Sequence, residues 1–193
     1  IGSLANDANT TGNYNVAIGH EALSTNITDS HNTAIGNNAL KTSNGGTHNT
    51  AVGSASMNAL TTGDYNVGVG SQTFDSLTTG ERNTALGYTA GTAITTGHRN
   101  VAVGSVAGQA LTTGAYSVFI GNNAGGATTV ANNNVAIGAS AMSSAVAGSS
   151  NTVIGFQAAQ GLNGGSENTT VGKDSMKDIT SGSGNSAFGV EAL

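Results

Sequence analysis

A glycine recurs at every seventeenth position from Gly2 to Gly189, without an insertion or deletion in 193 residues. The residue before each of these glycines is always apolar, and an asparagine stands four residues before nearly all of them. The asparagine column consists of Asn15, Asn32, Asn49, Asn66, Asn83, Asn100, Asn134, Asn151, Asn168 and Asn185, with Ser117 as its substitute. A short period kept this strictly is typical of a solenoid, in which each repeat stacks on the next. We therefore expect an all-β chain, a parallel β-solenoid of about eleven rungs.

The composition is consistent with a thin, stacked architecture. The chain has 30 glycines, no proline, cysteine or tryptophan, and only 8% charged residues, so it has little material for one thick core. Disorder would be the alternative, but a disordered segment has no reason to keep its repeats in phase. The absence of cysteine excludes a disulfide scaffold and a cysteine-based zinc site. A net charge of −5 with five basic residues argues against nucleic-acid binding. The sequence has no apolar run of 18 residues, so it does not predict a membrane span.

Both ends of the chain fall inside a repeat. The first residues, Ile1 and Gly2, are the Ile-Gly step of a unit, and Leu193 stands partway through another. We interpret residues 1–193 as a single repeat array cut from a longer fibre, with any targeting sequence or anchor outside it.

Each unit begins with a short strand of alternating character, Asn-Thr/Val-Ala-Ile/Val-Gly. The second and fourth positions are mostly β-branched or aliphatic, and we expect them to fill a narrow interior. The third and fifth positions are small, and we expect this opposite face to let another backbone approach. Phe119 and Val153 interrupt the small face, so a neighbour must yield there.

Two further apolar columns and a turn complete the unit. The ninth position is usually Leu, Met or Phe, and the twelfth is often Leu or Ile. Glycine interrupts the ninth position at 91, 108 and 125, where we expect Ile94 and Leu111 to compensate. A second glycine column at the fifteenth position predicts a turn with positive φ, and Asp29 and Ala131 are its exceptions.

The asparagine column has two structural interpretations. Amide side chains stacked at the strand spacing of about 4.8 Å can hydrogen-bond along the axis as a ladder. Alternatively, each asparagine stabilises its own turn through a local hydrogen bond.

A lone coil of this kind buries few apolar groups, so the free energy gained from burial barely offsets the entropy lost when the chain is ordered. Packing several chains along the small Ala/Gly face would supply the missing burial. The sequence therefore favours a homo-oligomer, and most naturally a trimer.

The strand motif resembles a known repeat class. It is seen in Asn15-Val-Ala-Ile-Gly19, Asn32-Thr-Ala-Ile-Gly36, Asn100-Val-Ala-Val-Gly104 and Asn134-Val-Ala-Ile-Gly138, and the match covers the whole chain. It is similar to the head repeats of YadA-like trimeric autotransporter adhesins, and more so to the longer repeats of phage and bacterial tail fibres. The resemblance implies a parallel β-roll in each subunit, trimerised into a stiff extracellular fibre on a cell surface or virion. Adhesin heads use a shorter unit of about fourteen residues, so the 17-residue unit is more similar to the repeats of the tail fibres.

No pattern predicts an enzyme, a cofactor or a metal centre. The acidic residues share no column, and we interpret them as solvated surface charges. The seventeenth position is different, because it carries aromatic and basic side chains in seven successive units: Tyr14, His31, His48, Tyr65, Arg82, Arg99 and Tyr116. Stacking would form a ridge about 30 Å long. This ridge is a candidate contact site for a glycan or partner protein, or else a row of long side chains that covers a turn.

Three alternatives remain for particular features. His31 and His48 are one rung apart, but two imidazoles without a third ligand make a weak metal site, so an exposed pair is the simpler interpretation. Doubled threonines such as Thr61-Thr62 suggest an ice-binding surface as an alternative. Neighbouring residues of a strand point to opposite faces, however, so a flat double row of threonines is not expected. Open terminal rungs could also stack end to end as a filament. We expect a non-catalytic, extracellular fibre segment that acts in attachment to a host cell or surface.

Overall fold

The computed structural model describes residues 1–144 and 147–193, and they form a β-solenoid of about ten turns with no helix. Eleven three-residue strands repeat at 17-residue intervals. They are β1 (Val16–Ile18), β2 (Thr33–Ile35), β3 (Thr50–Val52), β4 (Val67–Val69), β5 (Thr84–Leu86), β6 (Val101–Val103), β7 (Val118–Ile120), β8 (Val135–Ile137), β9 (Thr152–Ile154), β10 (Thr169–Val171) and β11 (Ser186–Phe188).

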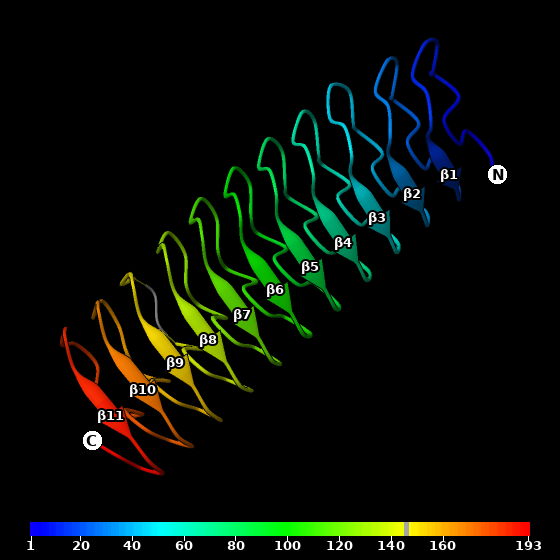
Figure 1. The fold of residues 1–193 in the computed structure, drawn as a ribbon. Helices are drawn as coiled ribbons and strands as arrows, with labels where there is room; N and C mark the ends of the chain where they lie inside the picture. Colours follow the sequence, from blue (N-terminus) through cyan, green and yellow to red (C-terminus); the bar gives the residue numbers. More distant parts are fainter. Residues whose placement is uncertain (145–146) are drawn as a thin grey trace.

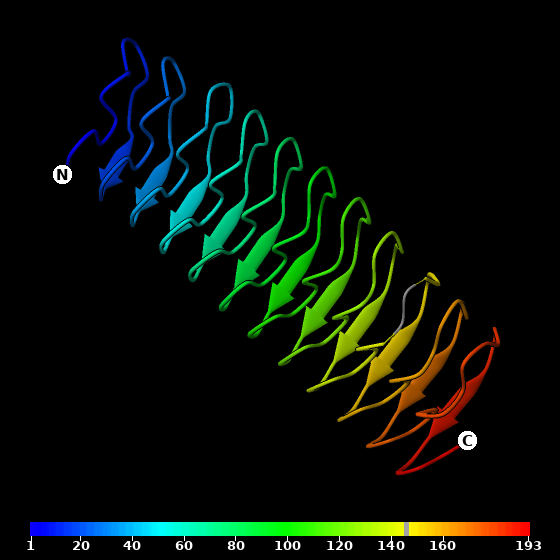
Figure 2. The same cartoon turned by 180° about the vertical axis from the view of Figure 1, so that it is seen from behind.

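The strands form one parallel sheet in chain order, and every strand pairs with the next without a shift in register. Ala17, for example, is opposite Ala34, and Val101 is opposite Val118. Each turn of the coil is a strand followed by loops that return the chain to the start of the next strand, and the two ends of the chain lie at opposite ends of the rod (Figure 1; Figure 2). The predicted architecture of stacked 17-residue rungs is therefore confirmed.

The prediction for the two strand faces was wrong. The middle residue of each strand points into the interior, where Ala34, Ala51 and Ala136 are fully buried. The second and fourth positions of the unit lie on the outside and are half-buried or exposed, as in β5, where Leu86 is 48% exposed. The interior already receives large side chains from the ninth and twelfth positions, such as Leu60 and Met57. Where the ninth position is large, a small residue fits beneath the strand, so the β-branched side chains face outward; Phe119 and Val153 are buried there in rungs whose ninth positions are Gly125 and Ala159.

The strand-end glycines do allow close approach of a backbone, but it is that of the next rung. A Cβ atom on Gly87 would lie 2.6 Å from the carbonyl oxygen of Gly104, and Gly87 has φ +134°. Both the conformation and the space therefore require glycine. In the turn column the predicted positive φ is found at Gly148 and Gly182 but not at Gly63 or Gly80. At these two the reason for glycine is space, since a Cβ on Gly63 would lie 2.1 Å from the Gly80 oxygen.

Large and small residues exchange places inside the rod. In the rung of β7, Phe119 takes the place of the usual alanine and Gly125 takes the place of the usual leucine or methionine. The ring of Phe119 fills the space over Gly108 and Gly125, and the ring of Phe74 fills that over Gly91. Contrary to the sequence prediction, Phe119 and Val153 therefore do not displace a backbone packed on an outer face; both are buried in the interior. The compensation for the ninth-position glycines comes from these two phenylalanines, with Ile94 as a further neighbour of Gly91.

Candidate functional site

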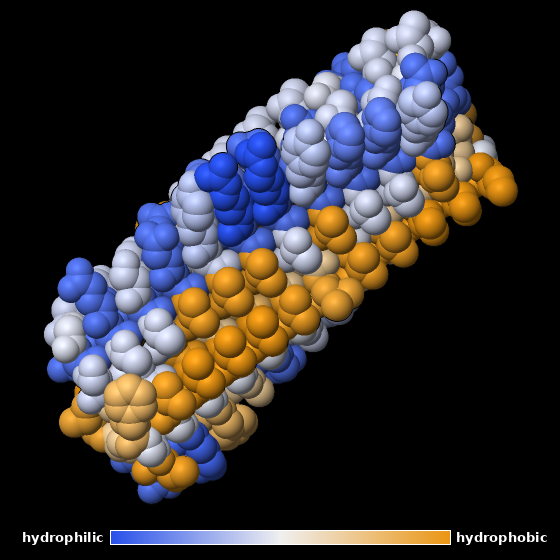
Figure 3. All heavy atoms as spheres, viewed as in Figure 1, coloured by the Kyte–Doolittle hydropathy of each residue, from blue (hydrophilic) through white to orange (hydrophobic). Residues whose placement is uncertain are grey.

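The seventeenth-position ridge (Tyr14, His31, His48, Tyr65, Arg82, Arg99 and Tyr116) lies on one side of the strands. Every ridge residue has left-handed backbone, with φ between 56° and 63°. The backbone around each is held by axial hydrogen bonds, such as those from the Tyr65 N–H to the Thr47 oxygen and from the Arg82 N–H to the Asp64 oxygen. In Figure 3 a column of polar side chains runs along the rod beside two apolar rows. The repeat thus places the ridge side chains one above another.

The first four rings of the ridge form a continuous stack. Ring centroids are 4.9 Å apart between Tyr14 and His31, 4.6 Å between His31 and His48, and 4.9 Å between His48 and Tyr65. The two imidazoles are nearly parallel, with 4° between their planes. Because the faces of the inner rings pack against each other, only their edges remain available. This arrangement does not offer the open aromatic faces on which a sugar ring would stack.

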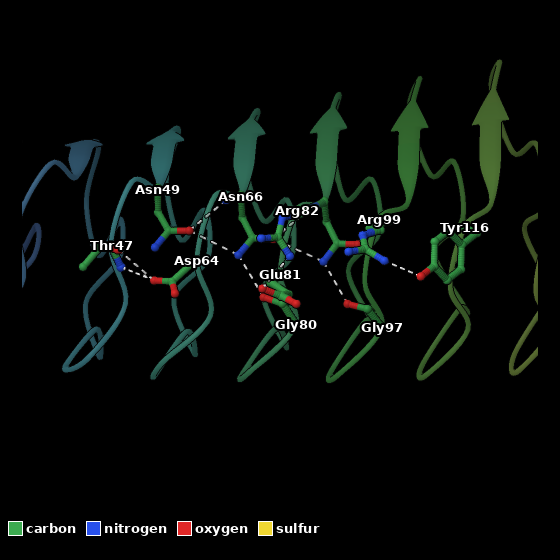
Figure 4. A network of polar contacts seen from close by, with 11 residues as sticks. Thr47, Asn49, Asp64, Asn66, Gly80, Glu81, Arg82, Gly97, Arg99 and Tyr116 are labelled. Carbon is green, nitrogen blue, oxygen red and sulfur yellow. Dashed lines mark hydrogen bonds and ion pairs between the residues drawn. The ribbon is translucent and has the colours of Figure 1, made fainter.

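The arginines continue the stack. The guanidinium carbon of Arg82 lies 5.6 Å from the centroid of the Tyr65 ring, and Arg82 pairs with Glu81 at 3.0 Å. Arg99 lies 5.2 Å from the Tyr116 ring centroid and also donates a hydrogen bond to the Tyr116 hydroxyl (Figure 4). Each cation thus has an aromatic neighbour in an adjacent rung, a geometry worth about 0.5–1 kcal/mol at an exposed site. The contacts limit the repulsion between the two stacked arginines.

Beyond Tyr116 the ridge becomes small and polar, although its backbone does not change. Asn133, Ser150 and Glu167 have φ values of 57°, 62° and 60°, and Gly184 has 71°. The left-handed conformation is therefore a property of the repeat and not of the aromatic residues.

Neither the histidines nor the acidic residues build a metal site. Among the described residues there is no group of three or more His, Asp or Glu side chains that could hold a metal ion. The interpretation of all acidic residues as solvated was wrong for Asp29, which is 3% exposed. Its carboxylate accepts hydrogen bonds from the Gly45 N–H at 2.7 Å and from the Ser43 hydroxyl at 3.2 Å. The carboxylate of Asp29 thus links two rungs at a turn position that is glycine in most repeats.

The asparagine column forms the axial ladder: the Asn83 Oδ1 accepts from the backbone N–H of Asn100 at 3.0 Å and from the Asn100 Nδ2 at 3.2 Å. The Asn83 Nδ2 donates to the Gly97 oxygen at 2.8 Å, fourteen residues ahead and beside Asn100, so this bond also links two rungs. The ladder interpretation is therefore confirmed at Asn83, and neither of these bonds is the local one of the alternative. Figure 4 shows this pattern repeating from Asn49 onward. At Ser117 the chain of bonds persists through the hydroxyl, which accepts from the Asn134 N–H at 3.3 Å. These buried side chains connect rungs and have no surface to offer a ligand.

The doubled threonines use one hydroxyl of each pair internally. Thr61 donates to the Thr78 oxygen at 3.0 Å, and Thr78 donates to the Thr95 oxygen at 3.1 Å. The second threonine of the pair, as in Thr62 and Thr79, is exposed. One exposed row does not make the flat double row that an ice-binding surface uses.

The outward residues of the strands form an apolar face that the sequence interpretation missed. We call the second and fourth positions of all rungs the apolar face. Its exposed members include Val16, Ile18, Val67, Leu86, Ile120 and Ile154, and its other valines and isoleucines are half-buried. Figure 3 shows these side chains as two adjacent rows along the rod, with the row nearer the strand ends almost entirely apolar. The fourth-position row is apolar in every strand, whereas the second position is threonine or serine in six of the eleven strands. Over ten strand spacings the face extends about 48 Å, and its two rows are about 10 Å wide, which gives about 500 Å² of mainly apolar surface. A patch of this size is at the upper end for a monomer.

The fold defines the class of this chain as a parallel β-solenoid repeat protein. No known protein family matches the sequence, and no curated protein or solved structure is significantly similar to it. The resemblance to adhesin heads and tail fibres therefore stays a prediction based on the repeat motif. The described residues include no helix of the length and hydrophobicity needed to cross a bilayer.

Proposed function

We propose that this chain is a non-catalytic segment of an extracellular, multi-chain fibre that serves attachment to a host cell or surface. The single observation that carries the proposal is the apolar face, which runs the whole length of the rod and is left uncovered by the chain itself. Burying such a surface is worth about 25 cal/mol per Å², so self-association through it would add substantial stability to a thin coil.

The partner surface is the apolar face of another copy, not the Ala/Gly positions expected from the sequence, because these lie in the interior. With the residues at its two margins, the face is about 17 Å wide and offers about 800 Å² per chain, which is the usual size of a stable interface. Three flat faces close around one axis without leaving an apolar edge in water, and the repeat motif's resemblance to trimeric fibres also favours three chains.

The oligomeric proposal is tested by sedimentation equilibrium of the wild-type chain and of a variant with Val103→Lys and Ile137→Lys. We expect the wild type to sediment as a trimer, and the variant to dissociate because charges on the apolar face are costly to bury. Gln109→Lys, at an exposed position outside the strands, is the matched control and should remain trimeric. A wild-type chain that stays monomeric at all concentrations would contradict the proposal.

Attachment is tested separately, with labelled fibres on cells and on immobilised glycans. The combined variant Tyr65→Ala, Arg82→Ala and Arg99→Ala removes the centre of the ridge. Its sedimentation is compared with that of the wild type first, because the ridge also borders the apolar face. If the variant still assembles, its binding should fall at least tenfold where the ridge contacts the receptor. Equal binding by this variant would remove the ridge as the contact surface. If the wild type itself does not bind, the segment is a spacer rather than an adhesive surface.

A further inference from the structure

Two columns of side chains border the apolar face, and they differ in character. The ridge and its continuation (the seventeenth position) precede each strand by two residues. The sixth position of the unit, which we call the sixth-position column, follows each strand by two residues and includes Tyr88, Ser105, Phe156 and Lys173. Both columns are largely solvent-exposed, and the two residues of a rung belong to one seven-residue segment, so they lie at nearly the same height.

Symmetry decides which columns meet when two apolar faces associate. A rotation axis parallel to the rod keeps the two rods parallel and their rungs in register, and it brings the ridge side of one copy to the sixth-position side of the next. A two-fold axis across the rod makes the copies antiparallel and brings ridge against ridge. The centred antiparallel arrangement places Arg99 of the central strand β6 against its own copy, which adds like-charge repulsion.

The two columns are complementary at equal height. Glu167 is level with Lys173, and among the described ion pairs Glu167 has no partner within its own chain. Lys173 pairs with Asp174 of its own chain, so Glu167 of a second copy would add a second carboxylate to the same ammonium group. Arg82 is level with Tyr88, whose ring is 58% exposed. Where the ridge position is small, at Ser150, the sixth position is large, at Phe156; where the ridge carries Arg99, the sixth position is Ser105.

We propose that the ridge side of one chain docks on the sixth-position column of a second copy of this chain, parallel and in register. Glu167 then pairs with Lys173 across the interface, and the Arg82 guanidinium contacts the Tyr88 ring. The apolar face supplies most of the buried area, and the bordering columns select the direction and register of the partner. This inference rests on the proposed self-association, and its failure would leave that self-association standing.

Charge reversal tests the pairing. Glu167→Lys should weaken assembly about fivefold or more, because it places two cations together at each contact, and Glu167→Lys combined with Lys173→Glu should restore it. The dissociation constant is measured by sedimentation, with circular dichroism to verify folding. Asp75→Lys, outside both columns, is the control for net charge. If the double variant is no tighter than Glu167→Lys alone, the pairing is overturned.

Disulfide trapping tests direction and register, and the chain has no cysteine of its own. Chains carrying Arg99→Cys and chains carrying Ser105→Cys, with different tags, are mixed, refolded together and oxidised. We expect a mixed disulfide, and none when Ser105→Cys is replaced by Ser71→Cys, which lies two rungs or about 10 Å away along the axis. A disulfide dimer formed by Arg99→Cys chains alone would show an antiparallel assembly and overturn the inference. A monomeric mixture would instead contradict the proposed function, and an oligomer without the mixed disulfide overturns only the pairing.

Discussion

Left-handed backbone at non-glycine residues is the most unusual feature at the residue scale. It recurs at the seventh, ninth and seventeenth positions, as in Gln72, Phe74 and Tyr65, with φ values of 56°, 51° and 58°. Such a conformation costs an ordinary residue roughly 1 kcal/mol or more. It persists because axial hydrogen bonds hold the backbone on both sides of it. These left-handed residues are hard to recognise from the sequence. Of the three positions, only the ninth carries glycine often enough to suggest positive φ, at Gly91, Gly108 and Gly125.

The asparagine column, by contrast, could be recognised from the sequence. An uncharged amide that recurs once in every repeat indicates hydrogen bonding within the stack of rungs. What could not be decided was the direction of its hydrogen bonds. That depends on the position of the Gly97 and Asn100 backbones around each amide, which the repeat pattern does not specify.

Asn83→Ala should lower the free energy of unfolding by about 3 kcal/mol. The substitution leaves the buried N–H of Asn100 and the buried carbonyl of Gly97 without their partner, and each such group costs about 1–3 kcal/mol. Chemical denaturation measures the loss. Asn44→Ala, at an exposed position in the loop, should change stability by less than about 0.5 kcal/mol. Equal effects at the two sites would mean that the axial bonds contribute nothing.

At the scale of the strand and its rung, the main lesson is the identity of the interior face. Alternation alone shows that two faces differ, but it does not say which one is inside. The large residues at the ninth and twelfth positions decide the matter, because they occupy the interior that the strand would otherwise fill. Counting the volume contributed by all columns, and not by the strand alone, would have placed the alanines inside.

The exchange of large and small residues predicts a rescue between two positions of one rung. Phe119→Ala should destabilise the rod by about 3–5 kcal/mol through the space left over Gly108 and Gly125. Gly125→Met alone should also destabilise it, because its Cβ would lie 2.4 Å from the Phe119 ring. The double variant reproduces the pairing of Ala136 with Met142 in the next rung and should recover at least half of the Phe119→Ala loss.

A double-mutant cycle by thermal denaturation measures that coupling. Leu60→Ala combined with Gly125→Met provides the control, because Leu60 lies in a distant rung and its effect should simply add. Additive effects of Phe119→Ala and Gly125→Met would contradict the shared-space explanation.

For the whole molecule, every rung contacts mainly its neighbours, so the length of the rod is set by the number of repeats. The sequence was sufficient to predict this architecture, because a fixed period requires stacked units. It could not reveal which surface is left uncovered, since that follows from the interior packing described above.

Removal of one whole period should leave the fold intact. Deleting residues 49–65 joins His48 directly to Asn66, keeps every column in phase and leaves the phenylalanine-to-glycine contacts of later rungs unchanged. We expect a folded rod about 4.8 Å shorter by small-angle scattering, with a single thermal transition. Deleting residues 49–57, about half a period, should disrupt the stack and lower the melting temperature. A comparable loss after both deletions would argue against independent rungs.

The asparagine hydrogen bonds also make the two ends of the rod chemically unlike. Each Oδ1 atom accepts a backbone N–H from the following rung, so Asn185 presents an amide oxygen to whatever lies beyond it, whereas the N–H of Asn15 requires an oxygen from whatever lies before it. A structural cap built for one terminus would thus be mismatched at the other. A protein segment that is fused to the rod should therefore supply a hydrogen-bond donor on the C-terminal side and a hydrogen-bond acceptor on the N-terminal side.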